Sequence, residues 1–544
     1  MSHASTRYDT VLVGSGINAL ICALTLADAG QKVLVLERRA KPGGCVDTQE
    51  ATLPGFRHDM MAMSWPLFVT SPHFPRWEAE LRALGVAFVN AEWPTATVLP
   101  DGRSLILTRS RPENVSRLNA VSEGDGTAYA LAMDDLLAHA PFVFGMLGNA
   151  PLGAQAGLTA WRALRRYGIG GMRALAPPLL EPMRAWLERD FRSDLTRALL
   201  APWILHAGQS PDEPMSGLIG KAITLSIEAA GAPLVAGGGD ELVKALIRMI
   251  EKRGGTVSCA AEVTRVLHDG RRARGVCLAD GRRFATRRVV CDVTPGQLYG
   301  RLLDPGAKAL DTARRHASRY RYGRGCMQIH LALAAPPAWQ DPALGGVALL
   351  HITPGLDGVL RATGEAQRGL LPAEATIVVG QPAHADPSRC PAGRSILWIQ
   401  LQELPFAPIG DAAGTLASSC SGQWTAELAE AYADRIIARL ETHIPGLRGQ
   451  IMARAILSPA DLAARNVNLE QGDPYSGACG IDQFHLNRGI PTETNYRTVL
   501  RGLWRIGAST HPGPGLGGMS GYLAAQEILS RTAFLGRMLG RASS

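Results

Sequence analysis

The stretch that decides the fold runs from Thr10 to Glu37 and reads TVLVGSGINALICALTLADAGQKVLVLE. Its first four residues predict a short buried strand, and residues 18–29 have helical spacing that stops at Gly30, a residue typical of helix ends. Val33 to Leu36 predicts a second buried strand. A strand–helix–strand unit of this kind implies a parallel sheet covered by helices, so the predicted fold class is α/β.

The turn between the first strand and the helix has the glycine spacing of a dinucleotide-binding loop. Gly14 permits the tight turn, Gly16 lets the backbone approach a pyrophosphate, and the small Ala19 allows the helix to pack closely on the strand. The first N–H groups of the helix and the helix dipole would face the phosphates. Glu37 follows the second strand, where a carboxylate accepts hydrogen bonds from ribose hydroxyls and repels the 2′-phosphate of NADP. The alternative, an ordinary turn without a ligand, leaves the position of Glu37 unexplained.

A second glycine pair, Gly43-Gly44, follows six and seven residues after Glu37. It resembles the glycine pair of flavoproteins with two dinucleotide-binding domains, in which the chain passes the pyrophosphate and the flavin a second time. A surface turn is the other interpretation, because glycine pairs are common in turns. The resemblance favours FAD over NAD.

The segment from Tyr8 to Asp59 resembles the phytoene-desaturase-like flavoproteins, a family that includes carotenoid desaturases, carotenoid ketolases and pyridine-nucleotide-disulfide-oxidoreductase-domain-like proteins. Asn18 and Leu20 match the family's pattern, and Ala19 replaces its usual glycine. Further matching stretches are Leu36-Glu37-Arg38, Gly55 to Asp59, Tyr496 to Thr498, Gly502 to Gly513 and Gly517 to Gly521.

The resemblance implies a Rossmann-type FAD-binding lobe and a mixed α+β substrate lobe. The FAD-binding lobe is expected from residues 1–90, 232–310 and 471–544, and the substrate lobe from residues 91–231, which are mostly helical, and 311–470. Residues 256–285 are expected to form a hairpin, because polar and apolar residues alternate there. The expected FAD contacts are Gly14, Gly16, Asn18, Ala19, Glu37, Arg38, Gly43, Gly44, Val263, Gly507, Ala508, Gly518 and Met519.

The implied reaction is hydride transfer from a substrate carbon to flavin N5, as in a desaturase, dehydrogenase or oxidase acting on an apolar, isoprenoid or carotenoid-like substrate. Carotenoid-ketolase-like oxygenation, flavin amine oxidase-like action on a small metabolite, and a non-catalytic flavin-stabilised interaction protein stay open as alternatives. His511 and His58 are the candidates for a catalytic base, although local hydrogen bonding is the commoner role of such histidines. We expect no covalent flavin link at Cys45 and no metal site, because no metal-ligand spacing is present.

The composition bounds the remaining functions. The 544 residues carry a formal charge of +8 without a dense basic run, which argues against nucleic acid binding. The nine cysteines lack a Cys-x-x-Cys pair and the N-terminal residues lack a signal-peptide pattern, so a cytoplasmic protein is expected. Residues 11–29 are apolar but interrupted by polar residues and glycines, so we expect no span there. Residues 141–190 mix apolar side chains with arginines, which is typical either of a helix resting on a membrane surface or of a core-facing helix with a solvated basic face.

Overall fold

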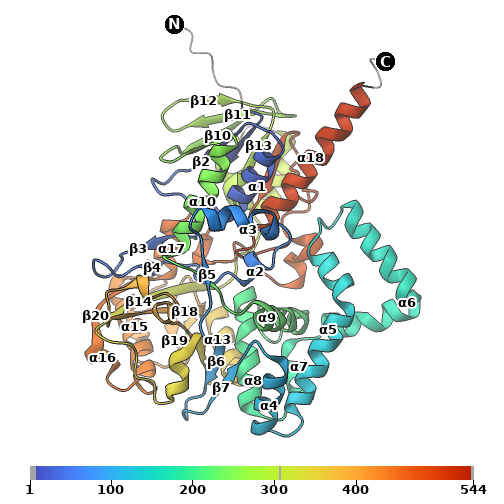
Figure 1. Cartoon of the computed structure of the whole chain (residues 1–544). Helices are drawn as coiled ribbons and strands as arrows, with labels where there is room; N and C mark the ends of the chain where they lie inside the picture. Colours follow the sequence, from blue (N-terminus) through green and yellow to red (C-terminus); the bar gives the residue numbers. More distant parts are fainter. Residues whose placement is uncertain (1–7, 306–307, 541–544) are drawn as a thin grey trace.

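The computed structural model describes residues 8–305 and 308–540. A five-stranded parallel sheet forms the upper lobe in Figure 1. Its strand order is β21–β13–β1–β2–β9, with β1 (Thr10–Val13), β2 (Val33–Leu36), β9 (Thr256–Ser258), β13 (Val289–Asp292) and β21 (Leu503–Ile506). The three central strands are buried hydrophobic runs, as expected of a parallel sheet covered on both faces.

Three helices cover one face of this sheet, and a smaller sheet covers the other. Helix α1 (Ile17–Asp28) packs against α10 (Gly239–Lys252) and α18 (Met519–Gly540) in one hydrophobic core. On the opposite face, apolar residues of β10 (Val263–His268) and β11 (Ala273–Leu278) share a second core with the sheet. The predicted strand–helix–strand unit and the α/β fold class are therefore confirmed.

The expected hairpin over residues 256–285 is only partly correct. Strand β9 pairs in parallel with β2, so it extends the dinucleotide-binding sheet instead of entering a hairpin. Strands β10, β11 and β12 (Arg283–Ala285) then form a three-stranded antiparallel sheet. Alternation of polar and apolar residues marks both kinds of strand and does not reveal which partner each strand takes.

A seven-stranded sheet forms the core of the lower lobe in Figure 1. Helix α15 (Ala426–Glu441) buries Leu428, Tyr432, Ile436 and Leu440 in the hydrophobic core of this sheet. The strand order is β20 (Ile451–Leu457), β14 (Gly325–Leu333), β18 (Ser395–Leu404), β17 (Ile377–Gly380), β15 (Val347–Ile352), β6 (Trp93–Val98) and β7 (Ser104–Leu107). All neighbours are antiparallel except β15 and β6.

The two large sheets draw their strands from different segments of the chain. Every strand of the five-stranded sheet lies within residues 1–90, 232–310 or 471–544, and every strand of the seven-stranded sheet lies within 91–231 or 311–470. This distribution is the one expected for two lobes built from alternating segments, although the lobe boundaries themselves stay a prediction.

The helical block beside the seven-stranded sheet carries an arm on the outside of the molecule (Figure 1). Helix α6 (Ala154–Leu180) lies beyond α5 (Asp125–Leu147) in Figure 1 and contains a kink at Gly168. Helix α5 is the one helix of the described residues that is long and apolar enough to cross a membrane, and 17% of its most apolar window is buried. By contrast, α1 is an apolar helix buried in the core, as expected.

Candidate functional site

A cavity of about 400 Å³ lies between the two large sheets and is lined by residues of both. Val13, Leu36 and Asp292 contribute from the carboxyl ends of β1, β2 and β13. In open α/β sheets, ligands bind in the crevice outside the carboxyl ends of the strands. The opposite wall comes from β14, β15 and β18 of the seven-stranded sheet.

The glycines of the two predicted loops form a cradle that side chains would fill. Gly16 and Gly43 form an isolated parallel β-bridge, which brings the two loops together. A Cβ added at Gly16 would lie 2.7 Å from Asp292 Oδ2, and one at Gly44 would lie 3.1 Å from the Cα of Gly16. Gly14 has φ +95°, a conformation that glycine adopts without strain. Backbone N–H groups at the start of a helix, reached through glycines, fit a pyrophosphate.

Ser15 connects the cradle to the acidic residue at the end of β2. Its backbone N–H and hydroxyl both donate to Glu37 Oε2, at 3.0 and 2.6 Å, and its hydroxyl accepts from the Gly43 N–H at 3.1 Å. The N–H of Arg39 donates to Glu37 Oε1 at 2.8 Å. These bonds hold the Glu37 carboxylate at the cavity wall, where a ribose would reach it.

Most of the predicted cofactor residues line this cavity. They are Gly14, Gly16, Asn18, Glu37, Arg38, Gly43, Gly44, Val263 and Ala508. Ala19, Gly507, Gly518 and Met519 are not among the lining residues. Cys45 also lines the cavity, and burial raises the pKa of its thiol to about 11.

The glycines near the C-terminus serve helix packing behind the cavity. A Cβ at Gly521 would overlap the carbonyl oxygen of Asn18, and one at Gly518 would lie 2.6 Å from Ile21 Cγ1. These two glycines therefore let α18 approach α1 closely. The N–H of Gly507 donates to Ser520 Oγ at 3.0 Å, which ties β21 to the start of α18. Direct flavin contacts of Gly507, Gly518 and Met519 stay a prediction.

Asp292, which the sequence analysis did not single out, lies at the centre of the cradle. Its carboxylate faces the positions at which Gly16 and Gly507 leave no room for a Cβ. Desolvation by burial, opposed by a hydrogen bond from the Ala19 N–H and reinforced by the nearby Glu37 carboxylate, raises its pKa to about 7. Its place at the carboxyl end of a buried strand was the signal available in the sequence.

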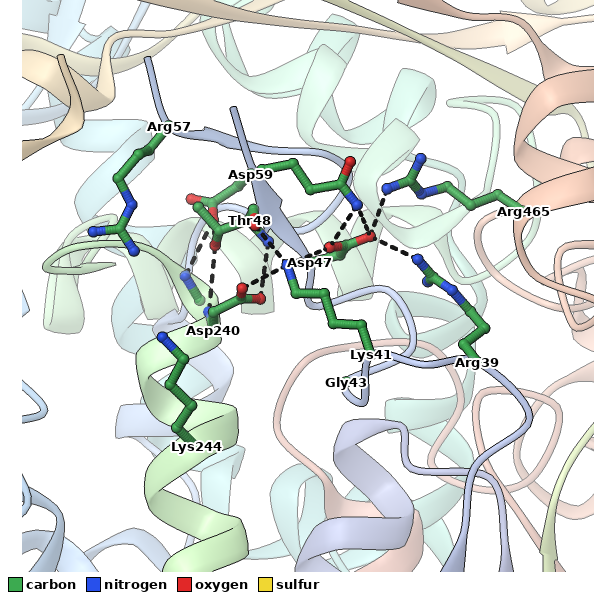
Figure 2. A network of polar contacts seen from close by, with 12 residues as sticks. Arg39, Lys41, Gly43, Asp47, Thr48, Arg57, Asp59, Asp240, Lys244 and Arg465 are labelled. Atoms are coloured by element: carbon green, nitrogen blue, oxygen red, sulfur yellow. Dashed lines mark hydrogen bonds and ion pairs between the residues drawn. The ribbon is translucent and has the colours of Figure 1, made fainter. Parts of the chain in front are cut away.

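A cluster of charged residues joins the second glycine loop to the rest of the molecule (Figure 2). The buried Asp47 binds Arg39 at 3.1 Å, Lys41 at 2.8 Å and Arg465 at 2.6 Å. Lys41 also binds Asp240, at the start of α10, at 2.6 Å. Arg39 and Arg465 line the cavity, so the Asp47 carboxylate orients two cations at the edge of the cavity.

The opposite wall carries amides among apolar side chains. Cys326 and Gln328 come from β14, Leu349 from β15, and Trp398, Gln400 and Gln402 from β18. The sequence analysis did not identify the glutamines, because amides on two separate strands follow no motif with a fixed spacing.

The two histidines predicted as bases do not line the cavity. The buried His58 lies 2.8 Å from Thr52 Oγ1 and packs edge-on against His330. The buried His511 packs edge-on against His485. Both side chains are buried, and neither is among the residues that line the cavity.

The histidine that does line the cavity is His206. Its Nε2 lies 2.9 Å from Nε2 of the buried His351, and both rings pack against Trp203. Desolvation lowers the pKa of His206 to about 4, so its imidazole is neutral at neutral pH. His206 lies in a helical segment without a motif, so the sequence offered no signal for it.

The chain is similar over nearly its whole length to several oxidoreductases. It is 27% identical to pyridine nucleotide-disulfide oxidoreductase domain-containing protein 2 of Mus musculus, over 96% of this chain and 93% of that protein. It is 25% identical to one of the subunits of limonene dehydrogenase from Castellaniella defragrans, over 96% of this chain and 94% of that subunit. It is 24% identical to a lycopene-forming phytoene desaturase of Paracoccus sp., over 98% and 99%.

Solved structures share the fold. A putrescine oxidase variant superposes with a TM-score of 0.60 and 16% identity, over 96% of this chain and 99% of that one. Cyclohexylamine oxidase from Brevibacterium oxydans gives a TM-score of 0.55 and 16% identity, over 97% and 100%. The profile of the family described as flavin containing amine oxidoreductase matches residues 20–443. With a cradle suited to a dinucleotide at the ends of its parallel strands, the chain belongs to this family and is an FAD-dependent oxidoreductase related to the phytoene desaturases.

Proposed function

We propose that the protein is a dehydrogenase or oxidase that removes a hydride from a carbon of a substrate with an apolar, isoprenoid-like body. The observation that carries this proposal is the apolar part of the cavity wall, lined by Met61, Met63, Leu67, Leu349, Trp398 and Leu516. An apolar wall of this kind favours burial of hydrocarbon. The names of the limonene dehydrogenase and the phytoene desaturases, both terpenoid-processing relatives, support the same substrate class.

The residues of the chain have separable tasks in such a reaction. FAD, when bound, supplies the hydride acceptor. The glycine cradle would hold the pyrophosphate, and Glu37 the ribose, while the Trp398 side of the cavity would orient the substrate. We propose that His206 accepts the proton that the substrate loses, because it is the one histidine among the described residues that line the cavity.

The test is anaerobic titration of the FAD-loaded protein with isoprenoid hydrocarbons, isoprenoid alcohols, amines and polar metabolites. Bleaching of the oxidised-flavin band by an isoprenoid compound is the expected result. Reduction by small amines alone would favour the amine oxidase alternative. If no compound reduces the bound flavin, the dehydrogenase proposal fails and the non-catalytic alternative gains support.

A matched pair of variants tests His206. His206→Asn should slow flavin reduction by about 100-fold, the lower range for loss of a general base, without changing the oxidised-flavin spectrum. His58→Asn changes a histidine that does not line the cavity and should leave the reduction rate nearly unaltered. Equal rates for His206→Asn and the unmodified protein would remove His206 from the mechanism.

We also propose that α5 and α6 rest on an anionic membrane surface. Residues 136–180 contain four arginines and no acidic residue. On α6, Trp161 is 51%, Leu164 45% and Ile169 82% exposed, and all four arginines are exposed. Exposed apolar side chains beside cations suit insertion into the headgroup region of anionic lipid. Such contact would place the protein at the surface into which a lipophilic substrate partitions.

Co-sedimentation with vesicles of phosphatidylglycerol and phosphatidylcholine tests this contact. Replacing Arg162, Arg165 and Arg166 of α6 by Glu should abolish binding to the vesicles. The control replaces the exposed Arg248, Arg283 and Arg319 by Glu. It makes the same charge change elsewhere on the surface and should preserve binding. Binding that survives the first replacement, or that is equal on pure phosphatidylcholine, would contradict the proposal.

A further inference from the structure

Three glutamines form a polar patch on the wall of the cavity that faces the glycine cradle. Gln328 of β14 and Gln400 of β18 are direct partners in the antiparallel register, and Gln402 follows two residues later on the same face of the sheet. All three line the cavity. Gln328 and Gln402 are 1% and 4% exposed, so these amides are part of the buried wall.

A chain of hydrogen bonds fixes the orientation of the Gln402 amide. The Tyr475 hydroxyl lies 2.6 Å from the Leu205 carbonyl oxygen, to which it can only donate. Its oxygen must therefore accept the bond from Gln402 Nε2, at 2.9 Å. The other Nε2 hydrogen of Gln402 donates to Gln400 Oε1 at 3.0 Å.

Two carbonyl oxygens of the patch, those of Gln402 and Gln328, have no donor in the described part of the chain. Both hydrogens of Gln402 Nε2 are used, and its Oε1 is buried with no partner among the described residues. Gln328 Oε1 is also buried with no partner among the described residues. A buried polar atom without a partner costs about 1–3 kcal/mol, so these two oxygens, on residues that line the cavity, would gain from a hydrogen-bond donor brought by a ligand.

We propose that Gln402 and Gln328 bind a hydrogen-bond donor on the substrate, a hydroxyl or an amino group, and so select an isoprenoid-like molecule with one polar end over the corresponding hydrocarbon. This inference rests on the proposed function, because it assigns a further group to the same substrate. A pure hydrocarbon would leave both oxygens unpaired, whereas an alcohol or an amine donates to them. Tyr475 is a positioning residue, since it acts through Gln402.

The experiment uses the FAD-loaded protein and three probes with one ten-carbon isoprenoid skeleton: the alcohol, the primary amine and the hydrocarbon. Binding is measured from the perturbation of the oxidised-flavin spectrum, independently of turnover. We expect the alcohol or the amine to bind about tenfold or more tightly than the hydrocarbon, the effect of one net hydrogen bond. If the alcohol binds more tightly than the amine, the donor on the substrate is a hydroxyl group. If the amine binds more tightly, the donor is an amino group.

Variants separate the patch from the flavin. Gln402→Met and Gln328→Met keep the side-chain volume, and each should reduce the preference for the polar probe about tenfold while the FAD dissociation constant and spectrum stay unchanged. Tyr475→Phe frees the Gln402 amide to rotate and should weaken the preference less. Gln367→Met, on the exposed face of α13 (Leu356–Gln367), is the matched control and should change nothing.

Two results would overturn the inference. The first is equal binding of all three probes by the unmodified protein. The second is a loss of FAD affinity in Gln402→Met and Gln328→Met without a change of preference, which would assign the oxygens to the flavin. Bound flavin that no probe reduces would contradict the proposed function alone, because the binding measurement still reports on the patch.

Discussion

Gly16 has no room for a side chain, because a Cβ there would lie 2.7 Å from Asp292 Oδ2 and beside the loop that faces the pyrophosphate. Gly16→Ala should therefore lower the affinity for FAD by about tenfold or more while the fold is retained. FAD titration followed by flavin fluorescence measures the change. Gly364→Ala, at a position with open space around the added Cβ, is the control and should bind FAD normally. Normal FAD binding by Gly16→Ala would contradict the role of the cradle.

Asp292 gives the stability of the apoprotein a pH dependence. In the folded protein the pKa of the Asp292 carboxyl group is about 7, compared with 3.8 for the free side chain. Between these values the folded state binds more protons than the unfolded state, so the free energy of unfolding falls as pH rises from about 4 to 7. A shift of about three pKa units corresponds to about 4 kcal/mol at most.

Asp292→Asn removes this proton from the balance. In the variant, the free energy of unfolding should lose the part of its decrease with pH that Asp292 causes. The Tm of the variant minus the Tm of the unmodified protein should therefore be larger at pH 8 than at pH 5. Thermal unfolding of both apoproteins across this range measures the difference. Parallel pH profiles of the two proteins would show that Asp292 titrates as an ordinary carboxylate.

Motif spacing limited what the sequence could predict at single residues. Gly14, Gly16, Glu37 and Gly43 were predictable, because the close approach of backbone to a phosphate demands particular residues at a particular spacing. Gln328, Gln402 and His206 come from segments far apart in the chain that meet only in the folded molecule. Their side chains obey no local spacing rule, so the substrate side of the site was not predictable.

At the scale of secondary structure, the contact between α1 and α18 depends on Gly521, where a Cβ would overlap the carbonyl oxygen of Asn18. Because the obstacle is backbone of a buried helix, Gly521→Ala should lower the free energy of unfolding by about 1–3 kcal/mol. Denaturant unfolding measures this loss. Gly449→Ala, where the added Cβ meets open space, should leave stability within about 0.5 kcal/mol. A Gly521→Ala protein as stable as the original would show that the two helices can separate freely.

Elements with a strong local pattern were predicted well, and their partners were not. Strands β1 and β2 and helix α1 follow from unbroken apolar runs and helical spacing. The residues of β9 were recognised as extended, but their pairing with β2 depends on a contact more than two hundred residues apart in sequence. Such pairing is decided by the packing of the whole sheet, which no local window contains.

For the whole molecule, the buried Asp47 connects segments that are far apart in the chain. It binds cations from the loop after β2 and, through Arg465, from the end of α17 (Pro459–Arg465). Asp47→Asn leaves three cations around a neutral amide and should lower the free energy of unfolding by about 2–4 kcal/mol, since removal of one partner of a buried ion pair is strongly destabilising. The exposed Asp101→Asn, which loses a surface pair with Arg103, should lower the free energy of unfolding far less, because solvent screens an exposed pair. Equal losses for the two variants, compared by denaturant unfolding, would contradict the special role of Asp47.

The strand order of the parallel sheet also sets when the site can mature during protein synthesis. Strand β21, at one edge, pairs with β13, yet more than two hundred residues separate them along the chain. A ribosome that has translated β1, β2, β9 and β13 has therefore produced four neighbouring strands, of which β13 stays unpaired on one side until residues 503–506 emerge. Loading of the flavin should thus be among the last events in the biogenesis of this enzyme, and nascent chains released before that point are candidates for capture by chaperones.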